Sequence, residues 1–129
     1  MIKTNQPLAV IDLGTNTFHL LIAHADSQGG FAEIFRERRF VKLAQESIHF
    51  IHPTAYQRGV TTMLDYKEIL DRHQVAHVSA FGTAALRTAG NGTDFVREIK
   101  EKTGISIQLI DGNQEAGYIL PGSPPGHSL

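Results

Sequence analysis

The sequence predicts an α/β domain built on a mixed five-stranded sheet with helices packed on it, in the order β-β-β-α-β-α-β-α. Five segments combine apolar or alternating residues with turn residues at their ends, which is typical of strands. Three further segments carry apolar residues at helical spacing or begin with helix-capping residues. The 129 residues are enough for one domain with one hydrophobic core.

The first two strands are expected to form a hairpin. Leu8–Ile11 is apolar and stops at Asp12-Leu13-Gly14, and Phe18–Ala23 resumes with alternating apolar residues. A second turn signal, Gly29-Gly30, precedes a long third strand over Phe31–Leu43.

The third strand carries charged side chains of both signs. They are Glu33, Arg36, Glu37, Arg38, Arg39 and Lys42. The basic residues could form a patch for a polyanion, but the two glutamates alternate with them. The favoured interpretation is a solvated edge strand, because such charges also discourage edge-to-edge pairing.

A long helix is predicted over Pro53–His73. Its apolar residues recur at helical offsets, namely Tyr56, Val60, Met63, Leu64 and Leu70. Pro53 suits the first turn of a helix. The next strand is predicted over Val75–Phe81, ending at Gly82-Thr83.

A second helix is predicted from Asn91 or Thr93, either of which can cap it, to Lys102. Gly104 suits its C-terminal end, because glycine adopts the left-handed conformation that terminates helices. The alternating segment Ile105–Leu109 is predicted as the last strand.

The C-terminal part is expected to hold a third helix and a tail. The helix is predicted to begin at Asp111, with Gln114 in the reciprocal capping position. Residues 121–129 are rich in Pro and Gly and are expected to be disordered.

The composition excludes several classes of function. The formal net charge of −1 gives no overall basic field for nucleic acid, so an anion site must be built locally. The absence of cysteine excludes disulfides, thiol catalysis and zinc–thiolate sites. Asp12 interrupts the N-terminal apolar run and no apolar stretch is long enough for a membrane helix, so a cytoplasmic protein is expected.

Polar segments follow three of the predicted strands. The first is Asp12–Thr17, in which Gly14 lets a ligand approach the backbone and the polar residues after it add N–H, hydroxyl and amide donors. Asp12, at the strand end, can hold a hydrated Mg²⁺. The alternative is a simple hairpin turn, for which Asp and Gly are equally suited.

The second and third segments are also candidates for a ligand site. The segment Phe81–Ala89 contains Arg87, whose planar fork suits phosphate oxygens, although it could equally be a surface arginine. The third segment begins at Asp111 and contains Glu115, which is either a general base aligning a water or a first-turn carboxylate favoured by the helix dipole. All three segments lie at carboxyl ends of predicted strands, where open sheets place ligands.

Together, the three segments resemble the exopolyphosphatase / guanosine pentaphosphate phosphohydrolase (Ppx/GppA) family. The resemblance lies in Ala9–Ala23, in Gly82–Ala89, and in Gly112 with Glu115-Ala116, which occur in the order of the family's motifs. It extends over Leu8–Leu120. Asp-x-Gly-Thr alone would fit any actin-like ATPase or sugar kinase, whereas the Thr-Ala-Ala-Leu-Arg element is more selective.

The resemblance implies an actin/Hsp70-like (ribonuclease H-like) fold with two lobes and an active site in the cleft between them. Residues 1–120 would form the N-terminal lobe. The implied activity is Mg²⁺-dependent hydrolysis of terminal phosphoanhydride bonds in inorganic polyphosphate or pppGpp, which releases orthophosphate. The expected partners are this substrate and a second actin-like lobe, with no nucleic acid and no membrane; a homodimer stays an open option.

The resemblance also implies roles for individual residues. Glu115 matches the glutamate that aligns the water, and Asp12 matches the acidic residue near metal and phosphate. The positions that match phosphate-binding residues of the family are Gly14, Thr15, Asn16 and Arg87. These roles suit phosphoryl transfer, which requires mainly charge neutralisation and positioning.

Two departures from the family pattern leave alternatives open. The second phosphate loop of the family, Asp-x-Gly-Gly-Gly-Ser, is absent from the 129 residues, so half of the cleft is expected to lie outside them. Leu43–Ile48 stands where relatives have a Leu-Gly-Glu-Gly-Leu-like stretch. The alternatives are an ATP-binding lobe of another actin-like kinase or ATPase, and a non-catalytic module for phosphate-ligand binding or dimerisation.

Overall fold

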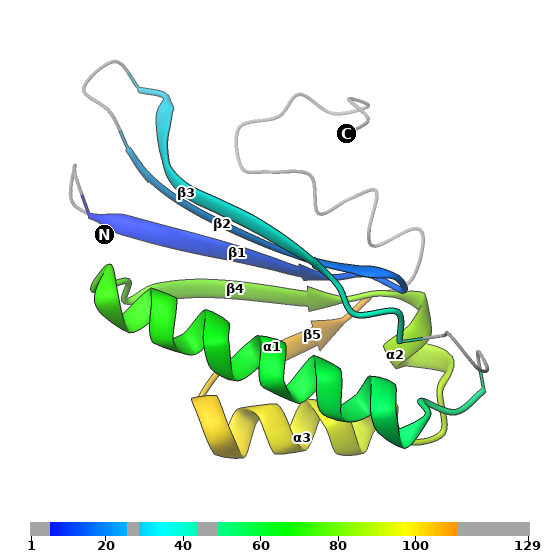
Figure 1. The fold of residues 1–129 in the computed structure, drawn as a ribbon. Coiled ribbons are helices and arrows are strands. Elements are labelled where there is room, and N and C mark those ends of the chain that lie inside the picture. Colours follow the sequence, from blue (N-terminus) through cyan, green and yellow to red (C-terminus); the bar gives the residue numbers. More distant parts are fainter. Residues whose placement is uncertain (1–5, 26–28, 44–48, 111–129) are drawn as a thin grey trace, which may run out of the picture.

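A computed structural model describes residues 6–25, 29–43 and 49–110 (Figure 1). A mixed sheet of five strands has the order β3-β2-β1-β4-β5. β1 pairs antiparallel with β2 and β2 with β3, whereas β4 is parallel to β1 and β5 is parallel to β4. The strands are β1 Pro7–Leu13, β2 Thr17–Ala25, β3 Phe31–Phe40, β4 His77–Gly82 and β5 Ile107–Leu109.

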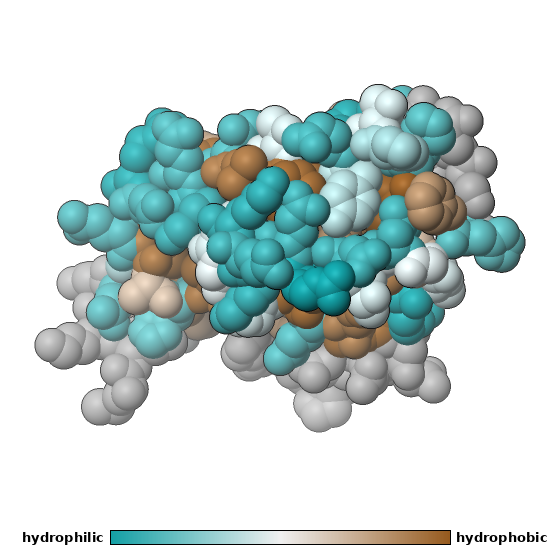
Figure 2. Space-filling model, turned by 90° about the horizontal axis from the view of Figure 1, so that it is seen from below, coloured by the Kyte–Doolittle hydropathy of each residue, from teal (hydrophilic) through white to brown (hydrophobic). Residues whose placement is uncertain are grey.

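The two long helices, α1 Pro53–Arg72 and α3 Gly92–Thr103, cover the same face of the sheet (Figure 1). A short helix, α2 Ala84–Thr88, lies between β4 and α3. Seen from the helical side, the molecule is mainly hydrophilic, with scattered hydrophobic groups (Figure 2). No helix within the described ranges is long and apolar enough to cross a membrane.

The core lies between the sheet and the two long helices. In β1 the buried residues alternate with half-buried or exposed ones, so that Ala9, Ile11 and Leu13 face the helices and Asp12 is exposed on the opposite face. This alternation follows from the two-residue period of a strand. The largest fully buried side chains of the core are Tyr66, Phe18, Phe95, Ile11, Leu13, Leu20, Ile22, Leu43, Ile51, Met63, Leu70 and Leu86.

A buried tyrosine attaches α1 to the sheet. The Tyr66 hydroxyl donates a hydrogen bond of 3.1 Å to the carbonyl of Phe18 in β2. Burial raises the pKa of the Tyr66 hydroxyl above its ordinary value, so it stays a donor over the physiological pH range. The ring of Phe95 from α3 packs edge-on against Phe18 and Tyr56, which joins both helices to β2.

The predicted fold class is confirmed, with differences at element ends. β1 continues through Leu13, because Asp12 and Leu13 still pair with β4. β3 ends at Phe40 instead of Leu43, because Lys42 has a φ of 54° and the chain leaves the ladder with β2 there. The five-residue helix α2 is an additional element in the predicted order.

The start of the second predicted helix also differs in detail. Asn91 occupies the N-cap position of α3, but its side chain makes no capping hydrogen bond. It instead accepts from the Ile51 N–H at 2.9 Å and donates to the Ile51 carbonyl at 3.0 Å. Gly104 ends α3 in the left-handed conformation, as predicted. The helix predicted from Asp111 and the tail predicted over residues 121–129 lie outside the described residues.

The packing of α2 against α3 predicts that Gly92 cannot be replaced. A Cβ atom at Gly92 would lie 1.9 Å from the carbonyl oxygen of Leu86, whereas one at Gly90 would come no closer than 3.6 Å to the carbonyl of His49. We expect Gly92→Ala to lower the free energy of unfolding by about 2 kcal/mol or more, because backbone atoms must move.

Gly90→Ala is the matched control, with an expected change within about 0.5 kcal/mol. Urea denaturation followed by circular dichroism measures both variants. Equal stability of the two would contradict the close approach of α2 and α3.

Candidate functional site at the carboxyl ends of the parallel strands

The carboxyl ends of β1, β4 and β5 meet at one edge of the sheet. In the register, Leu13 pairs with Gly82, and Gly82 pairs with Leu109. The pairing continues past the strands, since the Thr83 N–H donates to the Leu13 carbonyl at 3.2 Å and the Ile110 N–H donates to the Gly82 carbonyl at 3.0 Å. The structure therefore places the first two predicted segments side by side, with the chain entering the third segment beside them.

The first segment forms a tight turn between β1 and β2. The Gly14 N–H donates to the Thr17 carbonyl at 3.1 Å, and a Cβ atom at Gly14 would lie 3.0 Å from that carbonyl oxygen. A side chain at this position would require the Thr17 carbonyl to move slightly, so the close backbone favours glycine. Thr15 and Asn16, half-buried and exposed, occupy the tip of the turn.

The residues that follow β3 hold this turn in place. The carbonyls of Asn16 and Thr15 accept hydrogen bonds from the N–H groups of Lys42 at 2.8 Å and Leu43 at 2.9 Å. In a trans peptide the carbonyl of one residue and the N–H of the next point in opposite directions, so the Asn16 N–H is directed away from Leu43. Within the described parts of the chain, the N–H groups of Thr15 and Asn16 have no protein acceptor, as an anion-binding turn requires.

Asp12 lies one residue before the end of β1, exposed on the face opposite the helices. Its neighbours in the register are His19 in β2 and Phe81 in β4. Among residues 6–25, 29–43 and 49–110, it belongs to no cluster of three or more His, Asp or Glu. One accessible carboxylate beside a phosphate site fits Mg²⁺, which keeps several waters and is held by one or two carboxylates plus substrate phosphates.

Arg87 projects from the last turn of α2. The backbone N–H of Arg87 donates to the Thr83 carbonyl at 3.1 Å. Its guanidinium group donates to the carbonyl of Ile110, the residue directly after β5. This contact was not predicted from the sequence, and it attaches the second segment to the chain that leads to the third. Arginine has five N–H donors, so others remain for an anion. Glu115 and Gly112 lie outside the described residues.

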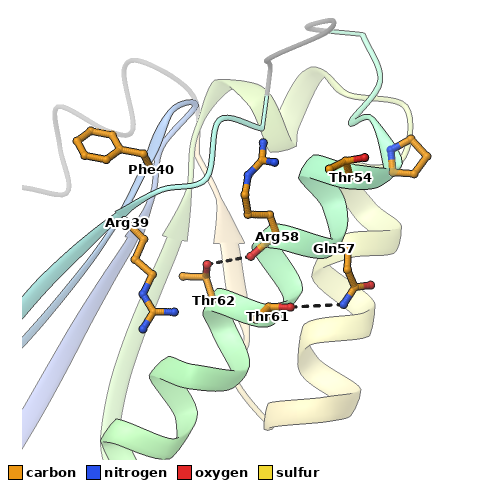
Figure 3. A pocket seen from close by; sticks show the side chains of 8 residues that line it. Arg39, Phe40, Thr54, Gln57, Arg58, Thr61 and Thr62 are labelled. Atoms are coloured by element: carbon orange, nitrogen blue, oxygen red, sulfur yellow. Dashed lines mark hydrogen bonds between the residues drawn. The ribbon is translucent and has the colours of Figure 1, made fainter.

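A shallow groove of about 790 Å³ lies at the same end of the molecule, between the end of β3 and the first half of α1 (Figure 3). Arg58 in its wall donates from Nε to the Val41 carbonyl at 2.7 Å. Arg39 forms an ion pair with Asp65, and this hydrogen bond is the main reason why the pKa of Arg39 is raised. The groove is lined by Arg39, Phe40, Pro53, Thr54, Gln57, Arg58, Thr61 and Thr62.

Sequence analysis missed the role of Arg58, because a lone arginine on a helix gives no signal of its partner. Its bond to Val41 braces the residues whose N–H groups hold the turn at Thr15 and Asn16. Arg58 therefore supports the candidate site from the helical side.

The contact between Arg87 and Ile110 predicts a structural role in the protein without ligand. We expect Arg87→Ala to lower the free energy of unfolding by about 1 kcal/mol, the typical net contribution of a hydrogen bond. Arg97→Ala is the control, because the Arg97 side chain forms an exposed ion pair with Asp94 on the surface of α3 and no other ion pair within the described residues. Thermal denaturation measures both, and unchanged stability of Arg87→Ala would rule out this attachment.

The fold is shared with distant proteins of other functions. RuvC from Thermus thermophilus superposes with a TM-score of 0.52 at 15% identity, over 84% of this chain and 68% of RuvC. At this level of identity the likeness concerns the fold alone. The sheet order and this superposition confirm the actin-like and ribonuclease H-like class predicted from the sequence.

Closer relatives match most of the chain in sequence and in structure. The chain is 35% identical to a guanosine-5'-triphosphate,3'-diphosphate pyrophosphatase of Vibrio vulnificus over 122 residues, which is 92% of this chain and 24% of that protein. An exopolyphosphatase structure from Cytophaga hutchinsonii has 38% identity and a TM-score of 0.83, over 87% of this chain and 36% of that one. A Ppx/GppA family member from Aquifex aeolicus has 26% identity and a TM-score of 0.80, over 88% of this chain and 37% of that one.

The chain thus spans about a quarter to a third of the length of these relatives, and it matches one lobe of longer proteins. The model of the Ppx/GppA phosphatase family matches residues 21–123. That match covers most of the sequence, and the chain belongs to the Ppx/GppA phosphatase family.

Proposed function

We propose that residues 1–120 form the N-terminal lobe of a Mg²⁺-dependent phosphatase that hydrolyses terminal phosphoanhydride bonds of inorganic polyphosphate or pppGpp. The observation that carries the proposal is the meeting of the turn after β1 with the start of α2 at one edge of the sheet. Two relatives, an exopolyphosphatase and a guanosine-5'-triphosphate,3'-diphosphate pyrophosphatase, support the two substrate classes.

The geometry supports a phosphate-binding role for the turn. The N–H groups of Thr15 and Asn16 are not used by the protein within the described residues, and backbone N–H groups at such a turn bind anions. Arg87 would add a charge-assisted contact from the neighbouring segment, because its bond to Ile110 uses only part of its fork. Gly14 keeps the backbone accessible.

Asp12 would hold Mg²⁺ at the carboxyl end of β1. The bound ion would neutralise phosphate charge as the reaction proceeds. In the proposed reaction, a water oxygen forms a bond to the terminal phosphorus and the bridging P–O bond breaks. The shortened phosphate chain leaves with the bridging oxygen, and the terminal phosphoryl group with the added water oxygen becomes orthophosphate. Glu115 would orient this water and accept its proton, a role carried over from the family.

A second lobe would complete the cleft. The relatives are longer proteins, and the segment Asp-x-Gly-Gly-Gly-Ser is not among these 129 residues. An enclosed site strengthens electrostatic contacts to phosphate, because water is excluded from it. We therefore propose that turnover requires this chain together with a second lobe, and that the chain alone supplies one wall of the site.

The test is a chimera in which this chain replaces the matching N-terminal part of the Vibrio vulnificus pyrophosphatase. We expect Mg²⁺-dependent release of orthophosphate from pppGpp or polyphosphate, measured by a colorimetric phosphate assay. Glu115→Gln in the chimera should reduce turnover by about 100-fold or more, while substrate binding is retained, since a general base contributes about 10²- to 10⁴-fold.

The control is Glu101→Gln, which removes an exposed carboxylate from the last turns of α3 and should leave turnover unchanged. Wild-type turnover by the Glu115→Gln chimera would disprove the assignment of the general base. Phosphate-ligand binding without turnover by the parent chimera would favour a non-catalytic binding module.

A further inference from the structure

Lys42 is held beside the proposed phosphate-binding turn. Its N–H donates to the Asn16 carbonyl at 2.8 Å, and the next N–H, of Leu43, donates to the Thr15 carbonyl at 2.9 Å. Val41 and Leu43 on either side are each only 1% exposed, whereas Lys42 itself is exposed. The alternation of buried, exposed and buried residues fixes the backbone of Lys42 at the turn.

Lys42 adopts a backbone conformation that is unfavourable for lysine. Its φ is 54°, in the left-handed region, where glycine and asparagine are the usual residues. The N–H groups of Lys42 and of the next residue make the hydrogen bonds to Asn16 and Thr15 in this conformation. Asparagine or glycine would adopt the same conformation at a lower cost in stability, so the presence of lysine suggests a use for its side chain.

The ammonium group of Lys42 also differs from most other cations of the protein. Ion pairs with carboxylates engage Arg36, Arg39, Lys67, Arg72, Arg97 and Lys102. Across the described residues, the Lys42 side chain makes no ion pair and no hydrogen bond, and the backbone N–H of Lys42 donates to Asn16. An accessible lysine without an ion pair within the described residues is thus attached through its backbone to the turn at Thr15 and Asn16.

We propose that Lys42 is a phosphate-contacting residue, which binds a second phosphoryl group of an oligophosphate whose first group lies on the turn at Thr15 and Asn16. The inference rests on the proposed function, because it assumes that the turn binds phosphate. The ligand class that fits is a chain of linked phosphoryl groups. A cation beside the turn raises the affinity most for an anion that is long enough to extend beyond the turn. If Lys42 were only a solvated residue of an edge strand, as expected from the sequence, its replacement would not change the affinity for an oligophosphate.

The test measures binding of inorganic tripolyphosphate to the purified chain by isothermal titration calorimetry at low salt with Mg²⁺. Lys42→Asn removes the charge but suits the left-handed backbone, so its melting temperature should equal or exceed that of the wild type. Its affinity for tripolyphosphate should fall about fivefold, the value of one solvent-exposed charge contact near 1 kcal/mol. Lys42→Arg keeps the charge and should bind within about twofold of the wild type.

Lys67→Gln is the matched control, because it removes one positive charge from the C-terminal half of α1. Its affinity should stay at the wild-type value. Wild-type affinity of Lys42→Asn, or an equal loss in Lys67→Gln, would overturn the role of Lys42 while leaving the phosphate site intact. A wild-type chain that does not bind tripolyphosphate would overturn the site at the turn, and the role of Lys42 with it.

Discussion

The parallel pairing of β4 with β1 determines where the parts of the candidate site lie. This pairing aligns Leu13 with Gly82, so that the turn after β1 and the start of α2 lie at one edge of the sheet. Hydrogen bonds from Thr83 to Leu13 and from Ile110 to Gly82 carry the alignment beyond the strands. A slip of one residue would turn the buried face of β1 toward solvent, so burial of Ile11 and Leu13 fixes the alignment.

The backbone of the turn at Thr15 and Asn16 is held by contacts from α1 and from the residues that follow β3. Arg58 in α1 binds the Val41 carbonyl, and the next two N–H groups hold the carbonyls of Asn16 and Thr15. The buried side chains of Val41 and Leu43 anchor this segment, residues 41–43, in the hydrophobic core. The turn is therefore held in place by the hydrophobic core and by α1, so the proposed binding of an anion would require little further ordering of the backbone.

Elements with a strong local sequence pattern could be predicted from the sequence. Pro53 and the apolar stripe after it predicted α1, and the motif order predicted the family. Three features could not be predicted because they depend on partners distant in sequence. The Asn91 side chain binds Ile51 instead of capping α3, β3 stops at Phe40 because the chain turns to hold Asn16, and Arg87 binds Ile110. Local propensity carries no information about such contacts, which arise only when the sheet assembles.

We propose that the turn after β1 binds phosphate through its backbone N–H groups. The most direct measurement is a titration of the ¹⁵N-labelled chain with Mg²⁺ and tripolyphosphate, followed by amide resonances in NMR spectra. Phosphate binding at the turn predicts saturable downfield shifts of the amide protons of Thr15 and Asn16, because each would gain a charge-assisted hydrogen bond. Shifts confined to the groove residues around Thr54 and Gln57, with those of Thr15 and Asn16 unchanged, would contradict it.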